Sequence, residues 1–426
     1  MSATPLAFSP SGTRSFGLLS GGHGILVRRR LDRLIMGVPA VTASYLSKLS
    51  VPPFGGLGLS LGIPLLCLTS ALGLAAGRLV TDFGRLLAYI ALLCLLWGIQ
   101  LLRAEPFSYA SLLLFTMLHF PYVLQLKRAP DYSQVLALYQ RVALSIAALG
   151  MLQYGIQFLI GPALAFPIEN FFPEAFKVSK FNMQGYLEYG SEVYRTNGVF
   201  MLEPSFYSQL LAVGVVIEAV TRARAWVLIV LLAGMVVSFS GTGLMLLAAC
   251  LPCQAIVKRR WDLLAAGVVL VAGAVTLAAL LDSPYLNVFF KRAGEFTATG
   301  SSGFARFVGG FYLFEQFLWP DVMRGLFGFG AGSLQAYQAK ATWSSGGNAF
   351  FKMIFEFGLV GGLAYFTFIG YVLRHSAAPV MLRVAVGFTY LLSGVYIPFS
   401  HSIALGLLVW PHAGTLAARA ASGRTT

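Results

Sequence analysis

Long apolar runs separated by short polar turns make up most of this chain. A helix that crosses a membrane needs about 20 mostly apolar residues. The clear runs of about that length lie at 55–77, 86–102, 107–126, 135–160, 203–221, 225–239, 241–257, 262–282, 348–373, 380–396 and 398–416. A further run at 34–51 is weaker, because it contains Lys48 and few bulky side chains. The pattern predicts an all-α, polytopic integral membrane protein.

Basic residues decide whether the weak run crosses the membrane. Lys and Arg of membrane proteins collect in short cytoplasmic loops and set the orientation of the chain. If the run at 34–51 spans, the basic doublets and triplets of the short loops all fall on one side, among them Arg28–Arg30, Lys127–Arg128 and Lys258–Arg260. The charges therefore predict about twelve transmembrane helices, with both termini in the cytoplasm.

This topology divides the chain into a basic cytoplasmic tail (1–33), one transmembrane domain (34–416) and a short cytoplasmic tail (417–426). Two long segments of the transmembrane domain, at about 161–202 and 283–347, fall on the non-cytoplasmic face. Irregular segments of this length in a compact protein are usually functional. We therefore expect the functional site to lie on these two segments, the first and second outer loops.

An aromatic pattern in the second outer loop predicts a helix. Phe304, Phe307, Phe311, Phe314 and Leu318 are spaced along one helical face. Two interpretations fit this spacing, an amphipathic helix in the membrane interface and a cap that covers the helix bundle.

Composition agrees with a membrane protein, since 57% of the residues are hydrophobic and 11% are charged, whereas soluble domains carry about 25% charged residues. The net charge of +14 is explained by cytoplasmic loops, so no nucleic-acid partner is expected. Cys250 and Cys253 form a C-x-x-C pair without a second pair or a nearby His, and a structural zinc site needs about four such ligands. We expect no metal and no cofactor.

The stretch "YRTNGVFMLEPSFYSQ" places Arg195 and Glu203 at the start of an apolar run, on the outer face. The planar guanidinium of Arg suits phosphate, and a Glu carboxylate suits general-base work on a hydroxyl. Pro204 favours the start of a helix, whose free N–H groups attract an anion. The alternative is that Arg195 and Glu203 only pair with each other at the membrane interface.

The second outer loop adds Arg306 and Arg324. The glycines of "GFGAGS" that follow come after no predicted strand, so they indicate tight turns rather than a nucleotide-binding loop. Lys352 and Glu356 are four residues apart, a spacing that lets them pair on one helical face. We expect this pair to be structural.

Three blocks of the sequence resemble the superfamily of O-antigen ligases and O-antigen or exopolysaccharide polymerases, the Wzy-type enzymes. They are "RTNGVFMLEPSFYSQLL", "SFSGTGLMLL" and the run from "SSGFARF" through "GFGAGS" to "GNAFFKMIFEFGLVGG". Gly347 stands before Asn348 where the ligase branch has His, and the Ser-rich turn lacks the Arg of many members. Both departures favour the polymerase branch.

The resemblance implies a membrane-embedded glycosyltransferase of GT-C-like architecture in the bacterial inner membrane. Such enzymes join oligosaccharide repeat units carried on undecaprenyl pyrophosphate, which serve as donor and acceptor. A flippase and a chain-length regulator are the partners that this activity implies. The important arginines of the family map onto Arg195 and Arg306.

The resulting hypothesis is an inverting, metal-independent transfer at the periplasmic face. Arg195 and Arg306 bind the pyrophosphate of the donor, and Glu203 accepts the proton of the attacking hydroxyl, with Asp321 or Glu315 as alternative bases. The residues expected to bind substrate are Arg324, Asn348, Tyr194, Tyr207 and Asn197. The rival functions are an O-antigen ligase that transfers the glycan to lipid A-core, and a transporter or flippase of lipid-linked oligosaccharides.

Overall fold

A computed structural model describes residues 21–52, 59–102, 107–179, 181, 183–187, 191–259, 276, 294 and 296–412. These residues are mostly helical, as the hydrophobic pattern predicts. The span expected at 262–282 lies outside the described residues except for Thr276, and the C-terminal tail 417–426 lies outside them altogether.

The first half of the chain consists of helices with one small antiparallel sheet. The helices are α1 (Gly21–Ser44), α2 (Gly62–Ala75), α3 (Phe83–Leu102), α4 (Tyr109–His119), α5 (Tyr132–Leu159), α6 (Pro162–Ala165) and α7 (Pro167–Phe171). Strands β1 (Leu79–Thr81) and β2 (Leu124–Leu126) pair so that Val80 lies opposite Gln125. Short 3-10 helices cover Phe120–Val123 and Glu174–Phe176.

The second half contains a helical bundle and the second outer loop. The helices are α8 (Pro204–Val220), α9 (Ala225–Val237), α10 (Gly241–Lys258), α13 (Ser302–Phe307), α14 (Gly309–Leu313), α15 (Val322–Phe327), α16 (Leu334–Gln338), α17 (Ala349–Arg374), α18 (Val380–Leu392) and α19 (Pro398–Ala404). Phe314–Leu318 and Leu405–Val409 are π-helical, and Trp410–His412 form a 3-10 turn.

Three of the described helices, α3, α5 and α17, are long and apolar enough to cross a membrane. Shorter apolar helices occupy most of the other predicted spans. Two runs differ from the prediction. The run at 34–51 stops being helical after Ser44, and Lys48, beyond that end, forms a buried ion pair with the first outer loop. The run at 107–126 leaves the α-helix at Phe120, next to Pro121, which cannot donate a backbone hydrogen bond. The count of twelve spans stays a prediction.

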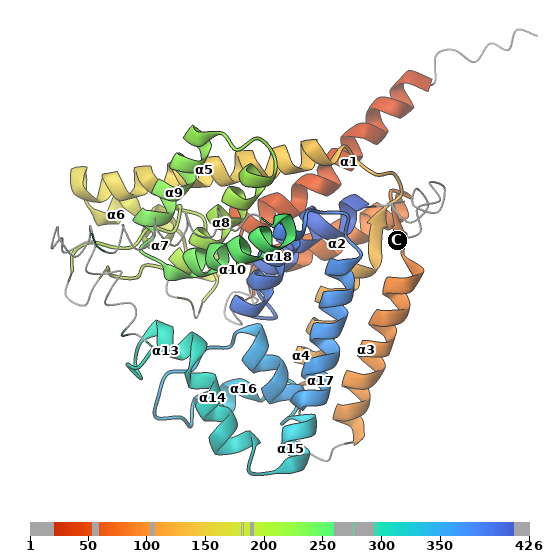
Figure 1. Ribbon diagram of the computed structural model, residues 1–426, viewed down its shortest axis with the longest axis vertical. Coiled ribbons are helices and arrows are strands. Elements are labelled where there is room, and N and C mark those ends of the chain that lie inside the picture. The colour runs from red at the N-terminus through yellow and green to blue at the C-terminus, as the bar shows by residue number, and fades with distance from the viewer. Residues whose placement is uncertain are drawn as a thin grey trace, which may run out of the picture.

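The helices pack as a bundle with the second outer loop at one end. Helices α5, α8 and α9 contact one another, and α10 packs against both α8 and α18. In Figure 1, α3 and α17 run side by side, and α13 to α16 gather beside the first part of α17. Helix α17 bends at Gly358, whose φ is 69°. A Cβ there would lie 2.2 Å from the Leu326 carbonyl, so only glycine lets α15 approach this closely.

The aromatic pattern of the second outer loop does not form one continuous helix. Helix α13 ends before Val308, and the chain restarts as α14 and then a π-helical turn. Phe304, Phe314 and Leu318 are buried, whereas Phe311 is 53% exposed. The buried members share a cluster with Phe351 and Phe355 of α17 or lie next to it. The loop therefore packs part of its aromatic face on α17, and the choice between an interfacial helix and a cap over the bundle stays a prediction.

A buried polar network holds the first outer loop. The Lys48 ammonium pairs with the Glu169 carboxylate of α7, and their side chains are 0% and 7% exposed. Asn197 donates to the same carboxylate at 2.9 Å and accepts from Gln153 of α5 at 3.1 Å. Gln153 also accepts from the backbone N–H of Val199 at 3.2 Å. These contacts tie the outer loop to α5 and to the turn after α1.

Candidate active site

Glu203 and Arg306 form an ion pair where the two outer loops meet. Glu203 is the N-cap residue of α8, but its side chain does not cap that helix. Its Oε2 instead pairs with Nη2 of Arg306 on α13 and accepts from the Ser205 hydroxyl at 3.1 Å. The two side chains are 13% and 29% exposed. Arg306 is thus one partner of Glu203 among the described residues, and it comes from the other outer loop.

The turn before Glu203 has an unusual backbone. Gly198 and Val199 both have positive φ, at 65° and 66°, a conformation that costs a β-branched residue energy. A Cβ at Gly198 would lie 2.8 Å from the ring of Tyr207. The Val199 carbonyl accepts from Lys48. The buried network of the first loop therefore holds a strained turn that sets the position of Glu203.

A first cavity of about 390 Å³ lies on one side of the Glu203–Arg306 pair. Its lining includes both arginines of the hypothesis, Arg195 and Arg306, together with the first residues of two helices. Pro204 and Ser205 begin α8, and Gly241 and Thr242 begin α10. Helix N-termini carry partial positive charge and unpaired N–H groups. Two guanidinium groups and two helix N-termini make this cavity suited to an anion.

Hydroxyl groups line the floor of the first cavity. Thr242 Oγ1 is within 3.0 Å of the hydroxyls of Ser208 and Ser240 and donates to the Ser205 carbonyl. A Cβ at Gly243 would lie 2.4 Å from the Ser208 carbonyl oxygen, so glycine permits the close contact of α8 with α10. The Ser-rich turn noted in the sequence thus belongs to the site.

A second cavity of about 380 Å³ adjoins the first and shares Glu203, Ser205 and Arg306 with it. Its polar lining consists of Gln335, Gln338, Asn348, Lys352 and Tyr396. Amide and hydroxyl groups both donate and accept hydrogen bonds. The second cavity is therefore suited to an uncharged ligand rich in hydroxyl groups.

Asn348 links the second cavity to Arg306. It caps α17, since its Oδ1 accepts from the Phe351 N–H at 3.0 Å, and its Nδ2 donates to the Arg306 carbonyl at 2.8 Å. Lys352 pairs with Glu356 at 2.5 Å, as the four-residue spacing predicts, and lies 4.9 Å from the ring centre of Tyr396. Glu356 is fully buried. Glu356 thus has a structural role in the core, whereas Lys352 lines the second cavity.

The other predicted substrate-binding residues lie outside both cavities. Asn197 belongs to the buried network, and Tyr207 is fully buried with its hydroxyl directed to the Ala147 carbonyl at 3.4 Å. Tyr194 stacks on Tyr186 at 4.6 Å, and the hydrogen bond between the two phenols raises the pKa of Tyr194. Arg324 lies over the ring of Phe329 at 4.9 Å.

Neither alternative base lines a cavity. Asp321 caps α15 by accepting from the N–H groups of Met323 and Arg324 at 2.8 and 3.2 Å, and Glu315 is exposed. Sequence reasoning missed Ser205, Gln335, Gln338 and Tyr396 as site residues, because nothing in their spacing distinguishes them from ordinary loop or helix positions. Among the described residues, no group of three or more His, Cys, Asp and Glu side chains is arranged to hold a metal ion.

Comparison with known families decides the kind of protein. The family model described as WcaD colanic acid polymerase matches residues 168–403, which is more than half of the chain and includes the second outer loop and most of the first. The chain belongs to the WcaD colanic acid polymerase family. Searches of the curated proteins and of the solved structures gave no match.

Membership of the WcaD family agrees with the resemblance to Wzy-type polymerases. It implies a membrane-bound, glycosyltransferase-type polymerase that acts on lipid-linked oligosaccharides to make exopolysaccharide or O-antigen. The matched region contains Arg195, Glu203, Arg306 and Asn348. The family therefore covers every residue that surrounds the two cavities except Leu59.

Proposed function

We propose that this WcaD-family protein joins undecaprenyl-pyrophosphate-linked repeat units at the periplasmic face of the inner membrane, with inversion and without a metal. The observation that supports this best is the pair of cavities that share Glu203 and Arg306. A polymerase must hold a donor with a pyrophosphate and an acceptor with a free sugar hydroxyl. One cavity suits each requirement, and their shared wall carries a carboxylate.

The donor pyrophosphate occupies the first cavity in this proposal. Arg195 and Arg306 supply planar guanidinium donors, and the N-termini of α8 and α10 add backbone N–H groups. Charge develops on the bridging oxygen as the sugar–phosphate bond breaks, and preorganised donors stabilise that charge. Two arginines and two helix N-termini supply the positive charge that this leaving group requires.

The acceptor sugar occupies the second cavity. Gln335, Gln338 and Asn348 offer amide groups, and Tyr396 offers a ring face and a hydroxyl. Glu203 lies at the boundary, where it takes the proton of the attacking hydroxyl. The hydroxyl oxygen forms a bond to the anomeric carbon of the donor, the bond from that carbon to the pyrophosphate breaks, and undecaprenyl pyrophosphate leaves with the electron pair. In this proposal the hydroxyl approaches the anomeric carbon on the face opposite the departing pyrophosphate, which gives inversion.

The Glu203–Arg306 ion pair couples donor binding to the base. The donor pyrophosphate competes for Arg306 and weakens its contact with Glu203 Oε2. That oxygen is then open to the attacking hydroxyl, so the acceptor contact forms once the first cavity is filled, which disfavours attack without a bound donor.

A reconstituted assay tests the proposal. Purified protein is given a defined undecaprenyl-pyrophosphate repeat unit in the presence of EDTA, and product length is measured. We expect Glu203→Gln to lose about 100-fold or more in rate, in the range that general-base catalysis contributes, while donor binding persists. Arg195→Lys should also fail, because Lys cannot make a bidentate phosphate contact. Near wild-type rates for both variants at normal protein levels, or loss of activity in EDTA, would refute the mechanism.

A further inference from the structure

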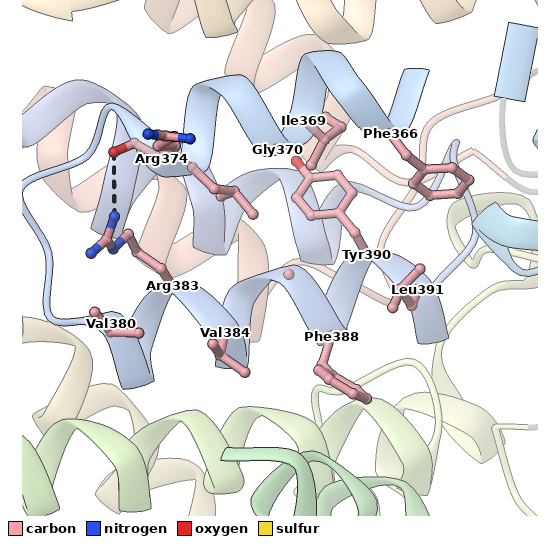
Figure 2. Close-up of a pocket in the computed structure, with 12 residues that line it drawn as sticks. Phe366, Ile369, Gly370, Arg374, Val380, Arg383, Val384, Phe388, Tyr390 and Leu391 are labelled. Carbon is pink, nitrogen blue, oxygen red and sulfur yellow. Dashed lines mark hydrogen bonds between the residues drawn. The ribbon is translucent and has the colours of Figure 1, made fainter. Parts of the chain in front are cut away.

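A groove runs between α17 and α18. It has a volume of about 470 Å³ and is lined mainly by apolar and small residues. Figure 2 shows Arg374 and Arg383 at one end of the groove and Phe366 and Leu391 at the other. The second active-site cavity includes residues at the other end of α17, Asn348 and Lys352, and no residue that lines the groove lines either active-site cavity. The groove is therefore separate from the site already described.

The two arginines come from different helices and converge without a carboxylate partner. Arg383 Nη1 donates to the Arg374 carbonyl at 3.3 Å. The Nε of Arg383 is buried and has no hydrogen-bond partner among the described residues. In that part of the chain, neither arginine forms an ion pair with Asp or Glu. Two guanidinium groups without a carboxylate partner at one end of an apolar groove suit a ligand that has an anionic head and an apolar tail.

The length of the groove matches one leaflet of a bilayer. Val380 and Leu391 mark its ends on α18, and at 1.5 Å per residue the helix between them is about 17 Å long. Half of a hydrocarbon core of about 30 Å is about 15 Å. By the distribution of basic residues, the end of the groove with the arginines faces the cytoplasm. The groove thus spans the cytoplasmic leaflet, with its charges at the level of the headgroups.

We propose that this groove binds one anionic glycerophospholipid of the cytoplasmic leaflet. Its phosphate lies between Arg374 and Arg383, and an acyl chain lies along the groove past Gly370 and Gly387. The polyprenyl tail of the substrate is the other apolar candidate, but its charged group belongs at the active site. Basic pockets at the cytoplasmic ends of transmembrane helices are a known type of site for acidic lipids.

Native mass spectrometry of the detergent-purified full chain tests the proposal, with phosphatidylglycerol and phosphatidylcholine of the same acyl chains as probes. We expect one phosphatidylglycerol per chain and weaker binding of phosphatidylcholine. Each of Arg374→Ala and Arg383→Ala should lower the affinity for phosphatidylglycerol about fivefold, and the double variant about 25-fold, from the usual contribution of one basic residue near an acidic lipid. Arg128→Ala, an exposed arginine outside the groove, should change nothing.

A second variant tests the acyl-chain part without changing charge. A Cβ at Gly370 would meet no atom within 4 Å, so Gly370→Leu starts its side chain in open space, occupies part of the groove and adds a better helix former. It should weaken phosphatidylglycerol binding while circular dichroism stays unchanged. Equal affinity for the two lipids, or full affinity in the Arg374→Ala/Arg383→Ala or Gly370→Leu protein, would overturn the proposal. Tighter binding of undecaprenyl phosphate, lost in the same variants, would reassign the groove to the substrate lipid.

Discussion

The two outer loops each deliver an arginine to the first cavity, but they are held in place by different forces. The first loop depends on buried polar contacts among Lys48, Glu169, Asn197 and Gln153. The second loop depends on aromatic packing against α17, as in the contact of Phe314 with Phe351 at 5.5 Å. Buried charges demand specific partners, whereas apolar cores tolerate substitutions of similar volume.

The two loops position different residues of the candidate site. The first loop positions Arg195 and, through the strained turn at Gly198 and Val199, also Glu203. The second loop positions Arg306, whose backbone is held by Asn348. The polar loop thus holds the proposed base and one proposed anion contact in a narrow geometry. The aromatic loop supplies Arg306, the arginine that changes partners in the proposed mechanism.

The largest expected effect distinguishes the two arginines. Arg306→Ala should lower the polymerisation rate about 10²–10³-fold, because it removes a preorganised donor to the leaving group. Arg195→Ala should cost about 10–100-fold, the value of one charge-assisted hydrogen bond. Rates of the two purified variants on the same lipid-linked repeat unit check this order. Equal losses of polymerisation rate in the two variants would mean that the exchange of Arg306 from Glu203 to the donor contributes nothing to the rate.

Breaking the polar network should destabilise the protein strongly. Lys48→Met leaves the buried Glu169 without its cation, which costs about 3–5 kcal/mol. The free energy of unfolding in mixed micelles measures the loss. Lys48→Met combined with Glu169→Gln should recover much of it, since neither side chain of the pair is then charged. If the double variant is as unstable as the single one, the network does not act through its charge.

The aromatic loop should tolerate a comparable exchange. Phe314 is buried among aromatic rings, and Phe314→Leu keeps an apolar side chain there. We expect a loss of about 1 kcal/mol in unfolding free energy, as for a swap of similar volume. The same micelle titration applies. A loss of unfolding free energy as large as that of Lys48→Met would show that the two loops tolerate substitution equally poorly.

The smallest effect is expected at Arg324, which lies on the second loop outside both cavities. Its contacts with Asp321 at 3.5 Å and with the Phe329 ring are partly exposed, and exposed pairs contribute about 0–1 kcal/mol. Arg324→Ala should change stability by less than 1 kcal/mol, in the same range, and should leave the polymerisation rate near wild type. A large loss of rate with normal stability would restore Arg324 as a substrate-binding residue.

The sequence by itself determined the features that depend on local spacing. Apolar runs predict helices because a membrane requires every backbone group to be hydrogen-bonded within its own segment. The Lys352–Glu356 pair follows from a spacing of four residues, and the start of α8 at Pro204 follows from proline chemistry. The same local signals singled out Arg195, Glu203 and Arg306, because charges beside apolar runs stand out.

Only the tertiary structure decided which of these residues meet. Glu203 and Arg306 are 103 positions apart, and Lys48 and Glu169 are 121 apart, so no periodicity links them. The hydroxyls beside the first cavity and the amides of the second come from helices and loops that approach only after packing. Helix formation is dictated by neighbours along the chain, but the pairing of charges depends on the packing that brings distant segments together.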